Sequence, residues 1–179
     1  MFFKGVSYGA PFFYGEMKMI EQCMEEWVKR LIFHEGMSLM PYYCPAGKLT
    51  IGVGRNLEDN PLTEEEKRAL GDYMHGITEN GAKMLLRNDI VACYAVLKKS
   101  VKMFDKLSAD RQYALLDMCF QLGWKGLKKF KRMLKEIERE NFDMAAFECL
   151  TSAYARQTPK RARRIARTIK FGYWSVADH

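Results

Sequence analysis

Residues 33–55 read FHEGMSLMPYYCPAGKLTIGVGR, and this stretch decides how the rest of the chain is interpreted. In residues 17–32, which precede it, apolar side chains recur every three or four positions, the spacing of an amphipathic helix. Gly36 is suited to end that helix. Aromatic and β-branched residues interrupted by Pro-Ala-Gly at 45–47 are typical of a short hairpin or small sheet. We therefore expect a helix that runs directly into a hairpin.

The remainder of the chain carries helical signals only. Thr63-Glu-Glu-Glu66 is a capping-box sequence that opens a short helix. Much later in the chain, Gly123 is expected to end the helix that precedes Gly123. Further helix starts are predicted at Thr78, Ser108, Asp143 and Thr158-Pro159. The order predicts an α+β fold, with a short antiparallel sheet confined to one early stretch and a mostly helical remainder.

The charge of the chain is unevenly distributed. Its 179 residues hold 29 Lys and Arg against 22 Asp and Glu, a formal net charge of +7. Residues 150–179 alone contain seven bases and one acid, so residues 1–149 are close to neutral. Basic clusters attract nucleic acid, anionic lipid or other polyanions. The composition, with 48% apolar and 28% charged residues, excludes wholesale disorder, and no apolar run is long enough to cross a bilayer.

The cysteines and the amino-terminal residues indicate no metal site and no export signal. Five cysteines without C-x-x-C spacing do not resemble a disulfide framework, and the three histidines form no zinc-ligand pattern. We expect reduced thiols and no cofactor. Residues 1–16 contain six aromatics interrupted by glycine and proline, and they lack the continuous apolar stretch of a secretory signal. They are interpreted as an irregular aromatic arm.

Three side chains of the opening stretch could meet in one cleft. Glu35 ends the first helix, Cys44 follows nine residues later, and Thr50 follows six residues after that. A carboxyl at a helix-to-sheet junction can act as a general acid if burial raises its pKa. The spacing alone leaves open the alternative that the three are a solvated acid, a turn residue and a strand residue.

Several blocks of the sequence resemble the T-even phage lysozyme family, the endolysins of glycoside hydrolase family 24. The resemblance begins with Phe33–Gly36, Tyr42–Cys44 and Leu49–Arg55. It continues through Phe120–Gly123 and Phe142–Ala146 to Gln157–Arg164 and Gly172–Trp174, in the family's order. It covers about residues 19–176. It implies a single lysozyme-like domain over 17–179, with a small lobe at about 33–78 and a helical lobe at about 79–179 that includes the first helix.

The resemblance implies a muramidase that cleaves the β-1,4 bond between N-acetylmuramic acid and N-acetylglucosamine in peptidoglycan. Glu35 aligns with the general acid that protonates the departing oxygen, and Thr50 with the residue that holds the attacking water. Cys44 replaces an aspartate of the family's reference member, although many endolysins also carry cysteine there. Cys44 could serve as a partial base, which inverts the anomeric configuration, or attack carbon directly, which retains it. We favour water attack because Thr50 is kept.

The resemblance also assigns residues to the saccharide cleft. Phe120 and Gln121 match positions that line it, Gln157 and Thr158 match its far wall, and Arg161 matches an arginine beside the catalytic glutamate. Phe120 could equally be a core residue and Gln121 a helix-surface amide. Arg55 replaces a histidine that forms a structural ion pair in the reference member, so we expect it to affect stability and not mechanism.

The resemblance predicts a monomer that accumulates in the host bacterial cytoplasm and reaches the wall in the periplasm through a holin. Its partners are peptidoglycan glycan strands, with no nucleic acid and no stable membrane insertion. Two alternatives stay open: a secreted antibacterial muramidase effector, and a cationic protein that permeabilises membranes without catalysis through residues 126–135 and the last helix. Nucleic-acid binding would explain the bases at 161–167, but no recognition module accompanies them.

Overall fold

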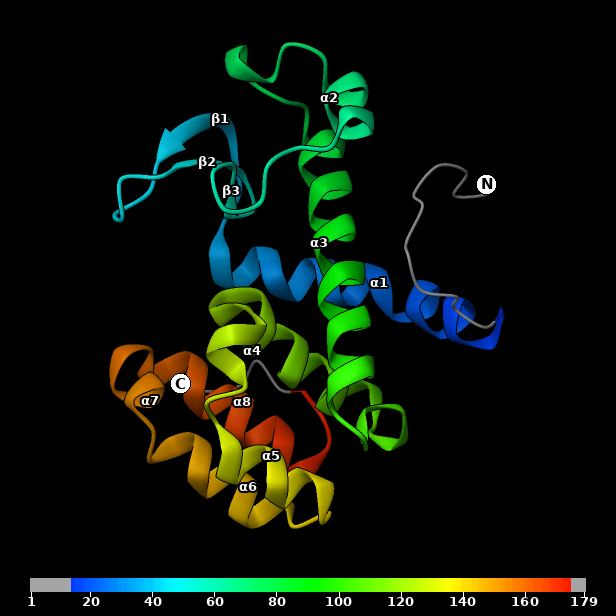
Figure 1. Ribbon diagram of the computed structural model, residues 1–179, viewed down its shortest axis with the longest axis vertical. Coiled ribbons are helices and arrows are strands. Elements are labelled where there is room, and N and C mark those ends of the chain that lie inside the picture. Colours follow the sequence, from blue (N-terminus) through cyan, green and yellow to red (C-terminus); the bar gives the residue numbers. More distant parts are fainter. Residues whose placement is uncertain (1–13, 175–179) are drawn as a thin grey trace. The chain divides into compact units, whose positions relative to one another are not determined.

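The computed structural model describes residues 14–174 and divides into two compact units, residues 1–89 and 90–179. The division falls within the helix α3 (Glu79–Ser100). The predicted lobes divide the chain at other positions, and the single lysozyme-like domain stays a prediction. Figure 1 shows a small sheet in the first unit and helices throughout the second, which confirms the α+β class.

The first unit begins with a long helix that leads into a three-stranded sheet. Its elements are α1 (Tyr14–Glu35), β1 (Ser38–Tyr43), β2 (Leu49–Gly52), β3 (Arg55–Asn56), α2 (Glu64–Leu70), the 3-10 turn η1 (Tyr73–His75) and the first half of α3. The strands are antiparallel in the order β1-β2-β3, with Tyr42 opposite Thr50 and Ile51 opposite Arg55. The hairpin predicted from residues 37–56 is therefore confirmed.

The helix α1 starts earlier than the sequence pattern indicates. Residues 14–16, assigned above to the aromatic arm, already belong to α1, while residues 1–13 lie outside the described part of the chain. At the other end, Gly36 at φ +74° donates its N–H to the Ile32 carbonyl at 2.8 Å, as the sequence predicts.

A compact apolar core holds the sheet against the helices of the first unit. Ile51 of β2 packs with Leu62, Ile77, Ala82 and Leu85. The capping box is present: the Thr63 hydroxyl accepts from the Glu66 N–H at 3.1 Å, and the Glu66 carboxylate accepts from the Thr63 N–H at 2.9 Å. The loop and α2 that follow the sheet are thereby fixed to it.

The second unit consists of helices arranged around α4. After the second half of α3 come the 3-10 turn η2 (Phe104–Lys106), α4 (Ala109–Leu127), α5 (Lys131–Glu138), α6 (Phe142–Leu150), α7 (Ala153–Gln157) and α8 (Pro159–Phe171). Every residue from Gln112 to Cys119 of α4 is buried, so this helix supplies the centre of the core. The helix α8 packs against α4, α6 and α7, and α6 also packs against α5.

The helix boundaries confirm most of the capping predictions and correct two of them: Asp143 does not cap α6, and the Thr158 side chain makes no capping hydrogen bond to α8. Ser108 caps α4 by accepting from the Arg111 N–H at 3.4 Å, and Gly123 interrupts helical geometry within α4. The helix α6 starts one residue before Asp143, because the Asn141 side chain accepts from the Met144 N–H at 3.3 Å and takes the cap position. Both residue types cap well, and the sequence alone does not distinguish them.

Candidate active site

Cys44 and Thr50 lie together at the turn end of the hairpin, while Glu35 lies just before the start of β1, and the charges of Cys44 and Glu35 both act on Tyr42. Glu35 is the last residue of α1 and is exposed. Cys44 follows β1, and its N–H donates to the Lys48 carbonyl at 3.0 Å, while its carbonyl accepts from the Gly47 N–H at 2.8 Å. Gly47 has φ +75°, which an L side chain would strain. This closed turn sets Cys44 beside the start of β2, where Thr50 lies.

Thr50 is held rigidly within the sheet. Its residue is 3% exposed, and its hydroxyl donates to the Lys48 carbonyl at 3.0 Å. Its side chain also forms a hydrogen bond with the Cys44 thiol. A buried hydroxyl fixed by its own backbone turn has little rotational freedom, so Thr50 can hold a small polar molecule in a defined place beside the thiol.

The thiol of Cys44 is more acidic than an ordinary cysteine. Hydrogen bonds from the backbone of Lys48 and Ala46 lower its pKa, helped by the Thr50 side chain and the positive charge of Lys48. The Lys48 ammonium is itself paired with the Asp59 carboxylate, which raises the pKa of Lys48 and keeps it charged. A lowered thiol pKa means a larger fraction of thiolate near neutral pH, and the thiolate is the basic and nucleophilic form.

Tyr42 connects the thiol to the carboxyl. Partial burial raises the pKa of its phenol, and the negative charges of Cys44 and Glu35 raise it further. Tyr42 therefore lies within electrostatic reach of both groups and stays a neutral hydrogen-bonding phenol at neutral pH. Tyr42 is not among the site residues predicted from the sequence. Side chains two positions apart on a strand point to the same face, so its position two residues before Cys44 could have indicated that the two lie on one face.

A buried ion cluster fixes the base of the hairpin. Arg55 of β3 bonds Glu66 of α2 at 3.1 Å and Asp89 of α3 at 2.8 Å, and Asn88 donates to Glu66 at 2.7 Å. The expected structural role of Arg55 agrees with this position. Burial opposes ionisation of Glu66, but the hydrogen bonds from Asn88 and the Thr63 N–H, together with Arg55, lower its pKa overall. The cluster positions β3, and through it β2 and Thr50.

The remaining predicted site residues lie in the second unit. Phe120 is half-buried and Gln121 exposed, both on α4, while Gln157 ends α7 and is exposed. Thr158 joins α7 to α8 and donates its hydroxyl to the Tyr154 carbonyl at 3.1 Å instead of capping α8. Arg161, one turn into α8, is buried at 8% exposure. The structure therefore groups Gln157, Thr158 and Arg161 around the α7–α8 junction.

Arg161 forms a buried ion pair with Asp117 of α4. Its Nε donates to the Asp117 carboxylate at 2.9 Å, and its Nη2 bonds the same oxygen. Asp117 lies one turn before Phe120 and Gln121, so the pair holds that turn of α4 beside the start of α8. Asp117 is not among the site residues predicted from the sequence. An acid inside the apolar run 114–119 could have predicted a buried ion pair, because a fully buried carboxylate requires a partner.

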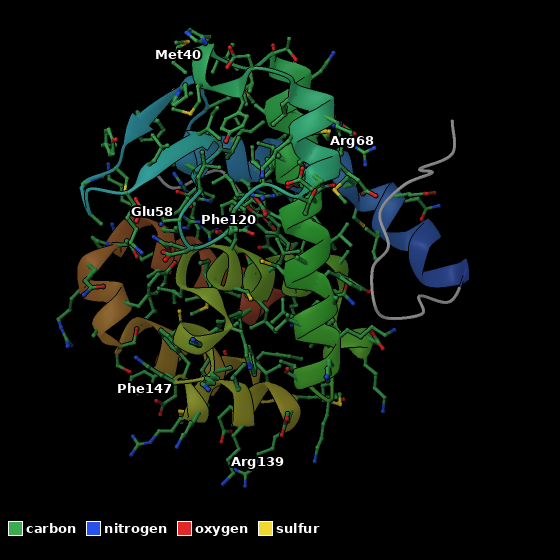
Figure 2. All side chains as sticks on the ribbon, turned by 45° about the horizontal axis from the view of Figure 1, so that its top comes forward. Met40, Glu58, Arg68, Phe120, Arg139 and Phe147 are labelled. Atoms are coloured by element: carbon green, nitrogen blue, oxygen red, sulfur yellow. The ribbon has the colours of Figure 1, made fainter. Side chains whose placement is uncertain are left out.

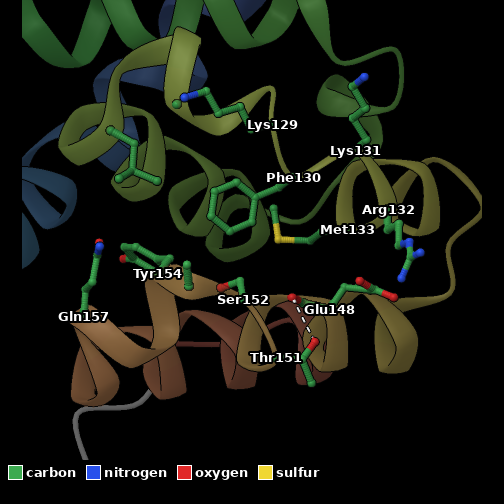
Figure 3. A pocket seen from close by; sticks show the side chains of 13 residues that line it. Lys129, Phe130, Lys131, Arg132, Met133, Glu148, Thr151, Ser152, Tyr154 and Gln157 are labelled. Atoms are coloured by element: carbon green, nitrogen blue, oxygen red, sulfur yellow. Dashed lines mark hydrogen bonds between the residues drawn. The ribbon is translucent and has the colours of Figure 1, made fainter.

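A pocket of about 870 Å³ opens beside this junction (Figure 3). Gln157 lines it, and Phe130 packs edge-on against Tyr154 at 6.0 Å on its wall. Lys129, Lys131 and Arg132 add positive charge to its lining, and Glu148 adds one carboxyl. The pocket has the mixed aromatic and polar lining that suits an oligomeric polar ligand.

Neither a metal-binding cluster nor a membrane-crossing helix occurs among residues 14–174. No group of three or more His, Cys, Asp or Glu side chains there could hold a metal ion. No helix in the same part of the chain is long and apolar enough to cross a membrane. All five cysteines lie within this part of the chain, and none of them forms a disulfide. The chemistry available at the hairpin is thus that of a carboxyl, an acidified thiol, a phenol and a fixed hydroxyl.

The first unit of this α+β chain carries a carboxyl and an ionisable second group, the kinds of group that glycosidases use. The family model for phage lysozyme matches residues 33–166, and the chain belongs to the phage lysozyme family. It is accordingly a lysozyme-type glycoside hydrolase whose substrate is peptidoglycan.

Relatives of this chain come from a cellular organism and from phages. The chain is 30% identical over 156 residues to "Probable T4-type lysozyme 2" of Dictyostelium discoideum, covering 79% of this chain and 92% of the relative. It is 27% identical over 128 residues to "Endolysin" of Acyrthosiphon pisum secondary endosymbiont phage 1, covering 72% and 77%. It is also 27% identical over 162 residues to "Pre-baseplate central spike protein Gp5" of Enterobacteria phage T4, covering 83% of this chain and 28% of that protein.

Proposed function

We propose that this lysozyme hydrolyses the β-1,4 bond between N-acetylmuramic acid and N-acetylglucosamine to lyse a bacterial host. The observation that carries the proposal is the hydrogen bond between the acidified Cys44 thiol and the fixed Thr50 side chain, with Tyr42 within electrostatic reach of both Cys44 and Glu35. The similarity to a phage endolysin supports the role in lysis. The enzyme is proposed to act as a monomer.

In the proposed reaction, Glu35 gives its proton to the glycosidic oxygen as the bond to the anomeric carbon breaks. Thr50 holds a water molecule, and the Cys44 thiolate takes one proton from that water as its oxygen bonds to the anomeric carbon. The products are two shorter glycan chains, a Glu35 carboxylate and a Cys44 thiol. Exchange of one proton with solvent restores both groups. Water attack from the opposite face inverts the anomeric configuration.

The proposed roles in the second unit concern binding. Phe120 and Gln121 are proposed to contact the saccharide, with Gln157 and Thr158 on the opposite wall. Of these four residues, Gln157 lines the pocket, whose polar and aromatic groups suit a glycan. Arg161 is proposed to be a substrate-binding residue, and its ion pair with Asp117 supports the role because the guanidinium is held in place.

The proposed route to the wall is synthesis in the host cytoplasm followed by holin-dependent release into the periplasm. A second candidate is a secreted antibacterial muramidase, which is favoured by the similarity to a lysozyme of the cellular organism Dictyostelium discoideum. Expression in a bacterium with and without a co-expressed holin separates the two. Lysis only in the presence of the holin supports the endolysin, and killing by added protein alone supports the secreted enzyme.

The test of the catalytic assignment is Glu35→Gln, compared with Glu21→Gln as a control on the same helix. Both side chains are exposed, so neither change should alter the fold. We expect Glu35→Gln to abolish clearing of purified peptidoglycan while circular dichroism stays unchanged, and Glu21→Gln to clear normally. Clearing by Glu35→Gln at the wild-type rate would refute the assignment.

A further inference from the structure

The outward face of α6 carries a row of large apolar side chains. Met144, Phe147 and Leu150 are 44%, 57% and 45% exposed, and they recur every three residues along the helix. Figure 2 labels Phe147. The opposite face of α6 packs into the core through Ala145, Ala146 and Cys149. We call the three exposed residues the α6 stripe. Single apolar residues are common on protein surfaces, but a contiguous row indicates a binding surface.

The helix beside this stripe carries bases and no acids. In α8, Lys160, Arg163, Arg167 and Lys170 are exposed, and the helix contains no Asp or Glu. Lys170 in its last turn bonds Asp143 in the first turn of α6 at 2.8 Å. The last turn of α8 lies at the first turn of α6, and the short helix α7 joins the end of α6 to the start of α8, so the two packed helices run in opposite directions, with the earlier turns of α8 beside the later turns of α6. The basic row thus extends along the α6 stripe.

The acids near the stripe are few and partly neutralised. Within α6, Asp143 is exposed and Lys170 pairs with it. Glu148, the other acid of α6, is half-buried and lines the pocket. Across residues 90–179, the sequence holds 19 Lys and Arg against 9 Asp and Glu. The surface therefore combines exposed apolar side chains with a positive field.

We propose that the α6 stripe and the α8 bases dock this unit on the surface of an anionic lipid bilayer. Apolar side chains enter the boundary between headgroups and acyl chains, while the bases attract the anionic headgroups. Such docking lies in the plane of the membrane and does not require a spanning helix. It goes beyond peptidoglycan hydrolysis, because it would hold the enzyme at the membrane face of the envelope.

Two other occupants explain less of the surface. A nucleic acid would contact the α8 bases but would gain little from three apolar side chains. A second copy of this chain in a two-fold dimer would bury the stripe but would bring two basic rows together, which is unfavourable. Both remain outcomes of the test.

The test measures binding of the whole protein to vesicles by flotation. Vesicles of phosphatidylglycerol with phosphatidylethanolamine should bind the protein, and vesicles of phosphatidylcholine alone should not. Phe147→Ser/Leu150→Ser should weaken anionic binding by on the order of tenfold or more, since two large side chains no longer leave water. Lys160→Gln/Arg163→Gln should weaken it at low salt and have little effect at high salt.

A matched control removes two exposed apolar side chains from the first unit. Leu39 and Met74 are 41% and 50% exposed, and Leu39→Ser/Met74→Ser should bind vesicles as wild type does. Equal binding by the stripe variant and wild type would overturn the proposal, as would an equal loss in the control. It would also be overturned if wild type sediments as a dimer that Phe147→Ser/Leu150→Ser dissociates. Nucleic acid would be favoured instead if the wild-type protein binds DNA and Phe147→Ser/Leu150→Ser weakens DNA binding as much as it weakens vesicle binding.

Discussion

The two units of this lysozyme differ in charge and in the kind of work that their side chains can do. Residues 1–89 hold 10 Lys and Arg against 13 Asp and Glu, a net charge of −3, while residues 90–179 have a net charge of +10. The acidified thiol and the candidate general acid belong to the first unit. The pocket, the basic helix and the apolar stripe belong to the second. The proposed chemistry thus lies in the first unit, and the proposed attachment to a polyanionic envelope lies in the second.

The largest expected effect concerns the thiol of the first unit. Cys44→Ser should lower kcat by about 10²–10⁴-fold, because serine is not ionised near neutral pH and cannot serve as a general base. Cys44→Asp should keep much of the activity. The thiolate is the active form, so kcat/KM should rise as pH passes upward through the lowered pKa of Cys44.

The pH profile is the control for that prediction. In Cys44→Asp the rising limb should move to lower pH, because a carboxylate ionises below the thiol. If Cys44→Ser keeps wild-type turnover, or if the limb stays in place in Cys44→Asp, then Cys44 has no role in catalysis.

The next effect compares the buried ion pairs of the two units. Asp117→Ala should destabilise the second unit by about 3–5 kcal/mol, because it leaves the Arg161 guanidinium buried without its anion. Glu66→Ala should act similarly on the first unit through Arg55. Urea unfolding followed by hydrogen exchange measures where the loss falls. If each substitution lowers the free energy of unfolding by less than about 1 kcal/mol, the two pairs contribute no more than exposed ion pairs do.

A smaller effect is the acid sensitivity of the first unit. The folded pKa of Glu66 is lowered, so the stability from its ionised form is present above the unfolded pKa. This stability should be lost as pH falls from the unfolded pKa of Glu66 through its lowered folded pKa. Unfolding midpoints measured across this acid range should fall more steeply in wild type than in Glu66→Gln. Parallel curves would show that Glu66 does not contribute to this dependence.

The smallest expected effect is that of salt on the second unit. Raising the salt concentration from about 0.05 M to about 0.5 M should slow clearing of intact anionic walls several-fold, because the field of the bases is screened. Hydrolysis of a short neutral glycan should change little. Equal slowing on both substrates would mean that salt acts on the catalytic groups instead.

The sequence predicted the helix-to-hairpin junction because its signals are local. Gly36 and the Pro-Ala-Gly turn at 45–47 act within a few residues, and the structure has both. The Arg161–Asp117 pair and the reach of Tyr42 to Glu35 depend on contacts between distant elements, which no local pattern specifies. Asn141 caps α6 in place of the predicted Asp143. The sequence does not distinguish the two, because Asn and Asp cap helices about equally well. The division into units also follows from tertiary packing and not from composition.

The most direct test of the account is identification of the new chain ends in digested peptidoglycan. Wild-type protein should release fragments whose new reducing end is N-acetylmuramic acid, as mass spectrometry after borohydride reduction can show. An anhydro-muramic end would indicate a lytic transglycosylase, and a reducing N-acetylglucosamine end would indicate cleavage of the other glycosidic bond. Either result would contradict the hydrolysis proposed here.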